Sequence, residues 1–194
     1  MRLQWLMSFP LLIVLLLPFP TRATTILRVP VSEMAQGSDL IVMGTVSAIT
    51  PLTDAGNPKK LRTQITVTVK KTLKGRATTS TIKMVFPGGR NDQWRVSVPG
   101  MPSFKKGEEV VLFLEKTEKG YTPAGLSLGK FSVVRDMATK RATASRKVAQ
   151  GVDLVREKNG RMRVPQTSER QDVFELDELI RIIRNAQKPL GGVR

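Results

Sequence analysis

The chain has no cysteine and no histidine among its 194 residues. Without cysteine it cannot form disulfides, so its folded part must be held together by its core alone. The two absences exclude Ser-His-Asp and Cys-His catalytic arrangements, and they exclude zinc and copper sites built on these ligands. Aromatic residues make up only 5% of the sequence, which leaves few rings on which nucleic-acid bases could stack. These shortages favour a binding or structural role over an enzyme.

The remaining catalytic and metal-binding patterns are poorly formed. Ser127 lies three positions before Lys130, but no apolar, strained elbow surrounds this serine. Glu108 and Glu109 are adjacent, so on a strand they point to opposite faces and cannot share acid–base work. The run Asp54–Asn57 is a turn signal and lacks the oxygen ligands that calcium needs. We therefore expect no cofactor, no metal site and no catalytic residue.

Residues 1–23 have the layout of a secretory signal peptide. An arginine at the second position supplies the positive start, and Leu6–Phe19 form an apolar block. The run Thr21–Ala23 then places small residues at the first and third positions of a cleavage site. We expect cleavage between Ala23 and Thr24, which makes the protein periplasmic or secreted.

A membrane anchor is the alternative interpretation of this leader. A membrane-spanning helix needs about 20 apolar residues. Here the apolar block is shorter, and it is interrupted or flanked by Pro10, Pro18 and Pro20. The missing cysteine also excludes attachment of a lipid, and no later segment is long and apolar enough to cross a membrane. A cysteine-free exported chain fits a bacterial protein better than a small eukaryotic secreted module.

The chain is strongly basic, with 32 lysines and arginines against 16 acidic residues and a net charge of +16. Removal of the leader would take away Arg2 and Arg22 and leave +14. Such a charge raises the rate of encounter with anionic partners. Outside the cytoplasm these are lipid head groups, acidic glycans, lipopolysaccharide or teichoic acid, whereas nucleic acid is less favoured. A basic surface that serves only solubility is the alternative.

The body of the chain predicts a mainly β fold. A short helix is expected over Ser32–Gly37, and a loop over Pro51–Lys60. Gly44, inside the first strand, indicates a bulge or a bend. Six or seven short strands with regular turn signals favour a small closed or partly closed β-barrel, or a sandwich. The expected strands cover Asp39–Ile49, Arg62–Thr72, Thr79–Phe86, Asn91–Val98, Val110–Leu114, Tyr121–Ala124 and Lys130–Arg135.

The predicted domain boundaries place the barrel at residues 24–136 and a basic extension at residues 137–194. Within the extension, the Asn159-Gly160 turn predicts a hairpin between residues 152–156 and 162–164. A helix that begins at Asp172 or Asp177 is expected to run through Gln187. Its apolar stripe could pack on the body of the protein, lie on a membrane surface or grip a partner helix. The stripe consists of Leu176, Leu179, Ile180 and Ile183.

Several segments occur in a fixed order between Val31 and Val134: Ser32–Ala35, Ser38–Val46, Thr68–Gly75, Pro87–Gly89, Pro99–Phe104, Gly107–Glu109, Leu112–Leu114 and Gly125–Phe131. On these segments the chain resembles a family of uncharacterised exported bacterial proteins, which implies export but no activity. More distantly, it is similar to the netrin-like modules of tissue inhibitors of metalloproteinases. That resemblance implies an OB-type barrel. It does not imply inhibition, because the inhibitory mechanism needs an N-terminal cysteine.

A candidate contact surface surrounds the glycine- and proline-rich loops. The run Pro87–Arg90 could be interpreted as a phosphate-binding loop, but such loops need a following helix, whereas a strand is expected here. A hairpin or bulge is therefore expected instead. The residues expected to contact a ligand are Arg90, Trp94, Arg95, Lys105 and Lys106.

The sequence thus predicts an exported, non-enzymatic binding protein with an OB-like barrel. It would contact a protein or an anionic envelope component through its basic surface. A structural or accessory role beside another exported protein, without a ligand, is the second hypothesis. An enzyme of unknown type is the third.

Overall fold

The computed structural model describes residues 25–27, 29–54, 57–93, 95–147, 152–156, 162–163 and 171–188. The expected signal peptide with its cleavage point between Ala23 and Thr24, the side chain of Trp94 and the Asn159-Gly160 turn lie outside the described residues. The expected mainly β class is confirmed: the described strands form sheets of eight, three and two strands, accompanied by two α-helices.

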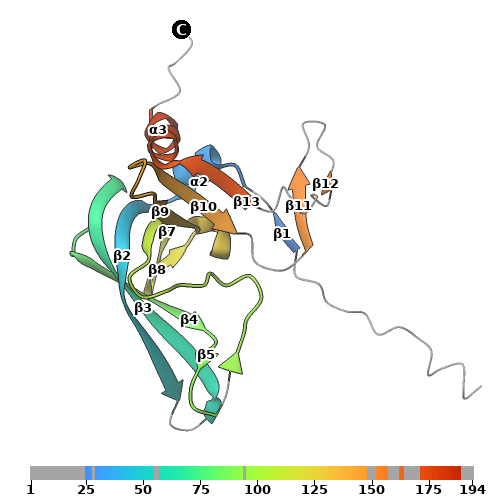
Figure 1. The fold of residues 1–194 in the computed structure, drawn as a ribbon. Helices are drawn as coiled ribbons and strands as arrows, with labels where there is room; N and C mark the ends of the chain where they lie inside the picture. Colours follow the sequence, from blue (N-terminus) through green and yellow to red (C-terminus); the bar gives the residue numbers. More distant parts are fainter. Residues whose placement is uncertain are drawn as a thin grey trace, which may run out of the picture.

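Most elements along the chain are strands, of which β2 and β3 are the longest, and few helices lie between them (Figure 1). They are β1 (Thr25–Leu27), α2 (Val31–Gly37), β2 (Leu40–Asp54), β3 (Asn57–Lys74), β4 (Thr81–Pro87), β5 (Gly89–Arg90), β6 (Arg95–Val96), β7 (Glu109–Thr117), β8 (Gly120–Pro123), the 3-10 turn η1 (Leu126–Gly129), β9 (Lys130–Arg135), β10 (Ala142–Lys147), β11 (Val152–Arg156), β12 (Met162–Arg163), β13 (Gln171–Glu175) and α3 (Leu176–Ala186).

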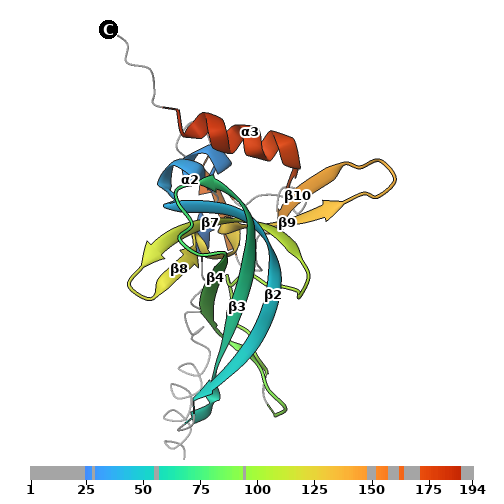
Figure 2. The same ribbon diagram turned by 90° about the vertical axis from the view of Figure 1, so that its left-hand side faces the viewer.

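The main sheet is antiparallel, with strand order β13-β10-β9-β7-β2-β3-β4 and β8 added on β7. Figure 2 shows how strongly β2 and β3 curve along their length. The expected barrel is not confirmed, because within the described residues no pairing joins β4 to β13. The chain instead adds β9, β10 and β13 beyond β7, which carries that edge of the sheet away from β4.

The first half of β2, residues 40–46, and residues 110–114 of β7 are largely buried on both faces, as expected for strands that are apolar without alternation. Their alternate residues enter two separate cores. The helix-side core packs one face of the sheet against α2 and α3, and it contains Ile41, Val111 and Phe113. The inner core fills the curve formed by β4, β3, β2 and β7, and its central members are Val42, Val110, Leu112, Val67 and Met84.

Helix α3 lies on the body of the protein, next to α2 (Figure 2). Of its two expected starts, Asp172 is wrong, because residues 171–175 form β13 and pair with β10, whereas Asp177 lies one residue after the observed start at Leu176. Strands β10 and β13 and helix α3, all from the expected extension, therefore continue the main sheet and its helix-side core. Neither helix in the described part of the chain is long and apolar enough to cross a bilayer. The apolar stripe is buried as expected at Leu176, Leu179, Ile180 and Ile183.

The expected loop over residues 51–60 is wrong. Strand β2 continues to Asp54 and β3 begins at Asn57, so these segments form the end of one long hairpin. Pro51 lies opposite Thr63, and no described strand flanks β2 on its other side beyond Thr45. An edge position tolerates proline because no second neighbour needs its missing N–H.

Gly44 marks an irregularity in β2, as expected. The register between β2 and β3 shifts between Met43 and Gly44. A Cβ at Gly44 would lie 2.3 Å from the carbonyl oxygen of Thr68, so no side chain fits between the two strands. The close approach of the backbones allows the hairpin to bend around the inner core.

Arg146 is the largest fully buried side chain, with 2% of its surface exposed. Its Nε donates to Asp172 Oδ2 over 2.5 Å, and its other nitrogens donate to the carbonyl oxygens of Leu128 (3.1 Å) and Val29 (3.0 Å). The guanidinium also lies 5.2 Å from the ring centroid of Phe131. One side chain on β10 thus joins β13, the end of η1 and the segment before α2.

We expect Arg146→Leu to lower the free energy of unfolding by about 3–5 kcal/mol, because it removes the buried hydrogen bonds that this charge makes with Asp172 and with the carbonyl oxygens of Leu128 and Val29. Urea unfolding followed by circular dichroism measures the loss. Arg135→Leu is the matched control, since Arg135 also binds a carboxylate but has a side chain that is 49% exposed, against 2% for Arg146. The control should lose about 0–1 kcal/mol. Equal losses in both variants would contradict the structural role of Arg146.

Candidate functional site

A two-stranded ribbon, β5 and β6, follows β4 and stands beside β3. Gly88 and Gly89 begin it with φ angles of 88° and 146°, which favour glycine. Gly88 N–H donates to the carbonyl of Leu61 over 2.9 Å, and Thr63 Oγ1 donates to the carbonyl of Gly88 over 2.9 Å. A Cβ at Gly89 would lie 2.4 Å from Thr63 Oγ1. The expected hairpin is thus confirmed, and it is fastened to β3.

Of the strand expected over Asn91–Val98, the structure confirms only Arg95–Val96, which is β6, so its expected extent is wrong. Gly89 pairs with Val96 and Arg90 pairs with Arg95, and the chain turns between them. The Oδ1 of Asn91 accepts a hydrogen bond from the N–H of Gln93 over 3.0 Å, which closes a local turn in place of an extended strand.

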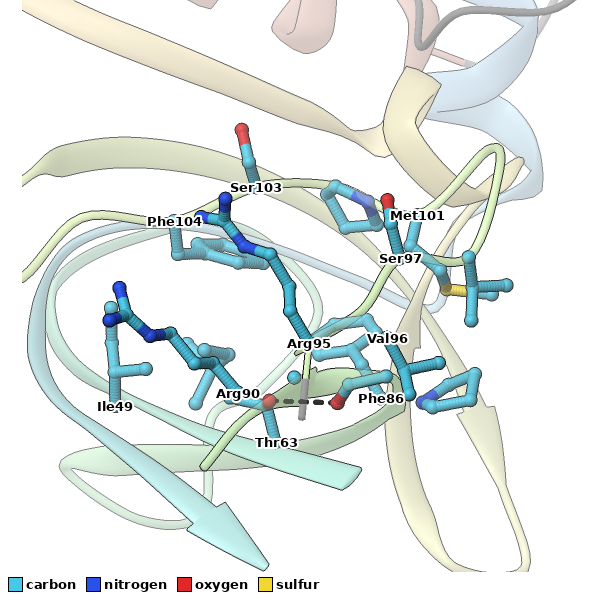
Figure 3. Close-up of a pocket in the computed structure, with 16 residues that line it drawn as sticks. Ile49, Thr63, Phe86, Arg90, Arg95, Val96, Ser97, Met101, Ser103 and Phe104 are labelled. Carbon is cyan, nitrogen blue, oxygen red and sulfur yellow. Dashed lines mark hydrogen bonds between the residues drawn. The ribbon is translucent and has the colours of Figure 1, made fainter. Parts of the chain in front are cut away.

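Arg90 and Arg95 lie directly opposite each other in this ribbon, and both are exposed. Like charges at opposite positions of an antiparallel pair are destabilising. Among the described residues neither arginine takes part in an ion pair. Figure 3 shows both side chains extending from the ribbon toward the same side, where Ile49 and Phe104 also lie. Asp92, in the turn between the two arginines, lines a small concavity together with both of them, but it forms no ion pair with either among the described residues.

A cleft of about 590 Å³ lies beneath these arginines. Its lining is largely apolar, and the rings of Phe86 and Phe104 face each other with centroids 5.6 Å apart. Ile49 and Val96 also line the cleft, and they remain 37% and 36% exposed. The cleft therefore offers an apolar floor below a positively charged rim.

The structure brings together only part of the expected contact surface. Arg90 and Arg95 share the cleft, whereas Lys105 and Lys106 are exposed and do not line it. Trp94 lies outside the described residues. The sequence analysis missed Ile49 and Met101 as lining residues. Nothing in the pattern marks them, because contact with the ribbon arises only when the β2–β3 hairpin bends toward it.

A buried ion pair fixes the wall of the cleft that carries Phe104. Lys130 Nζ donates to Glu108 Oε1 over 2.7 Å and to the carbonyl of Ser103 over 2.5 Å, and it lies 4.8 Å from the Phe104 ring centroid. Ser132 Oγ donates to the same Glu108 oxygen over 2.6 Å. Strand β9 thereby holds the segment before β7 in place. These contacts give Lys130, which lies three positions after Ser127 in the sequence, a structural role.

Burial and hydrogen bonding act in opposite directions on this pair. Burial alone would raise the pKa of Glu108, but hydrogen bonds from Lys130, from Ser132 and from the Lys105 N–H hold the pKa below its ordinary value. Burial lowers the pKa of Lys130, and the contacts with Glu108 offset this only in part. The hydrogen bonds therefore favour the ionised form of Glu108. This carboxylate stabilises the folded protein as long as it stays ionised.

A second basic concavity, of about 460 Å³, lies between α3 and β3. Ile180 contributes an apolar side chain to it, and Asp177 is its acidic lining residue. Its basic lining residues are Lys71, Arg181, Arg184 and Lys188. Helix C-termini favour nearby cations, so the position of Arg184 in the last turn of α3 has an ordinary structural explanation. Within the described residues no group of three or more carboxylates is placed to hold a metal ion.

We expect Glu108→Gln to destabilise the protein at pH 7 and to have a smaller effect at pH 3. The folded-state pKa of Glu108 is lowered, so the stability due to its charge is present above its ordinary value of 4.5 and is lost as the pH falls through the folded value. Urea unfolding of both proteins at the two pH values measures the difference. If the difference in the free energy of unfolding between the two proteins were the same at both pH values, the contribution of the ionised carboxylate would be contradicted.

The likeness to an exported bacterial family and to netrin-like modules comes only from the motifs described above. A scan against models of protein families found no match, and a search of curated protein sequences also found none.

Proposed function

We propose that this chain is an exported, non-enzymatic binding protein that contacts an anionic component of the bacterial envelope through the surface around β5 and β6. The observation that carries the proposal is the placement of Arg90 opposite Arg95 above an open cleft. The leader-like residues 1–23 and the net charge of +16 support export and an anionic partner.

The arginine pair is better explained by a ligand than by folding. Two cations placed opposite each other weaken the ribbon, and an anion between them would turn this repulsion into attraction. The planar guanidinium matches carboxylate and phosphate oxygens with paired hydrogen bonds. Because both side chains are exposed, the contact should weaken as salt screens the charges.

We also propose that β2, β3, β4, β7 and β8 form a partly closed, OB-like barrel. The support is the curvature of β2 and β3 around the inner core, together with the contact between β4 and β8. In this arrangement the ribbon and the cleft lie where β3 and β4 meet the long segment that leads to β7.

We expect the charge reversal Arg90→Glu with Arg95→Glu to abolish retention on anionic envelope components. The protein, purified after export from a bacterial host, is tested by co-sedimentation with phosphatidylglycerol vesicles and with lipopolysaccharide, at low and moderate salt. Vesicles of phosphatidylcholine provide the neutral reference. Lys116→Glu with Lys119→Glu is the matched control, because it makes the same charge change at two exposed residues that do not line the cleft. Unchanged retention of the arginine variant would contradict the proposal.

A protein partner is the second candidate, and the far end of the main sheet favours it. Val134 on β9 and Val173 on β13 are 65% and 56% exposed. They lie on one face of the sheet, since β10 places Thr143 opposite Val134 and Ser145 opposite Val173. Co-purification of one partner in equal amounts, insensitive to salt and lost in Val134→Asp, would favour this accessory role.

A further inference from the structure

The cleft below the arginines combines two features that a simple anion would not need. Its rim carries the opposed guanidinium groups of Arg90 and Arg95, and its floor is apolar. Ile49 and Val96 are among the few large apolar side chains that stay exposed in the described part of the chain. Both line this cleft, so the exposed apolar surface and the opposed charges coincide at one place.

Side chains packed behind the cleft fix its walls, so the cleft has its shape before a ligand binds. Phe86 is buried within β4 and packs against Phe104. Phe104 in turn lies under Lys130, which is fixed by Glu108. A volume of about 590 Å³ lies within the range of about 300–1,000 Å³ that is usual for small-molecule sites.

We infer that the cleft binds a single amphiphilic anion, with its oxyanion head between Arg90 and Arg95 and its alkyl or acyl chain against Ile49, Val96 and Phe104. This inference rests on the proposed function and names the class of ligand. A phosphate or carboxylate head satisfies both guanidinium forks. The alkyl or acyl chain of the ligand covers the apolar surface that the free protein leaves exposed to water. The ligand is bound as one molecule taken into the cleft, and not as the surface of a bilayer.

The probes are butyl, hexyl and octyl phosphate, each kept below its micelle concentration and measured by isothermal titration calorimetry on the exported chain. Affinity should rise with chain length, by up to about fourfold per added methylene, since burial of one methylene contributes about 0.8 kcal/mol. Inorganic phosphate should bind more than tenfold more weakly than octyl phosphate. Octyl glucoside, which carries the same chain without charge, should also bind more than tenfold more weakly.

Two variants separate the two halves of the site. Arg90→Gln with Arg95→Gln should weaken octyl phosphate at least tenfold, whereas Arg181→Gln with Arg184→Gln, the same change in the basic concavity beside α3, should leave it unaltered. Val96→Thr replaces an exposed side chain by one of similar shape, so the fold tolerates it. It should flatten the dependence on chain length and leave the binding of inorganic phosphate unchanged.

The outcomes distinguish this inference from the proposed function. Equal binding of inorganic and octyl phosphate, lost in the double arginine variant, would overturn the amphiphilic ligand and retain an anion-binding protein. Binding to anionic vesicles without affinity for the soluble alkyl phosphates would overturn the single-molecule ligand in the same way. Equal binding of octyl glucoside and octyl phosphate, unaffected by the arginine changes, would overturn both.

Discussion

The fold depends on one buried charge, the guanidinium of Arg146. Its hydrogen bonds end on Asp172 in β13, on the last turn of η1 and on Val29 before α2. These groups come from opposite ends of the described chain, and each needs a partner once the helices cover the sheet. An apolar side chain at this position could fill the space but could not satisfy the two carbonyls and the carboxylate. The helix-side core therefore closes around a polar centre that fixes how its layers meet.

A second buried charge joins separate segments of the chain on the opposite face of the main sheet. Lys130 begins β9 and fastens the segment that carries Ser103, Phe104 and Glu108. This segment forms a wall of the cleft, so the position of that wall is fixed by its contacts with the main sheet. The arginines stand on a short ribbon whose own pairing sets their charges against each other. The cleft thus has a rigid wall and, at its rim, an unfavourable pair of like charges. This combination is expected of a binding site, because proteins depart from locally favourable arrangements where they bind a ligand.

The sequence predicted those features that depend on local pattern. The apolar runs of β2 and β7, the stripe on α3, the irregularity at Gly44 and the hairpin after Pro87 all follow from spacing and residue type. The open sheet could not be predicted in this way, because β10 and β13 contain few large apolar residues and are held by pairing with β9. For the same reason the sequence left two possible starts for the last helix, Asp172 and Asp177, and did not predict the strand β13.

The candidate site was predictable only in its charges. Arg90 and Arg95 stand out beside two glycines, and the ribbon brings them together as the turn signals suggest. Lys105 and Lys106 are equally basic, but they do not line the cleft. The apolar lining comes from β2, from β4 and from the segment before β7, and their meeting depends on the curvature of the main sheet. Gly44 marks one point at which β2 bends, but the curvature of the whole sheet depends on long-range packing that no short stretch of sequence specifies.

The contact between Arg146 and Val29 spans 117 positions along the chain. Helices α2 and α3 likewise pack together from the two ends of the described fold. Contacts of such separation slow folding, because the chain must close large loops before they form. Under the proposed export, a chain that leaves the translocation pore N-terminus first would complete its helix-side core only after α3 had emerged. Until then Val111 and Phe113, the helix-side residues of β7, would lack the cover that α3 provides, and exposed apolar surface of this kind favours aggregation.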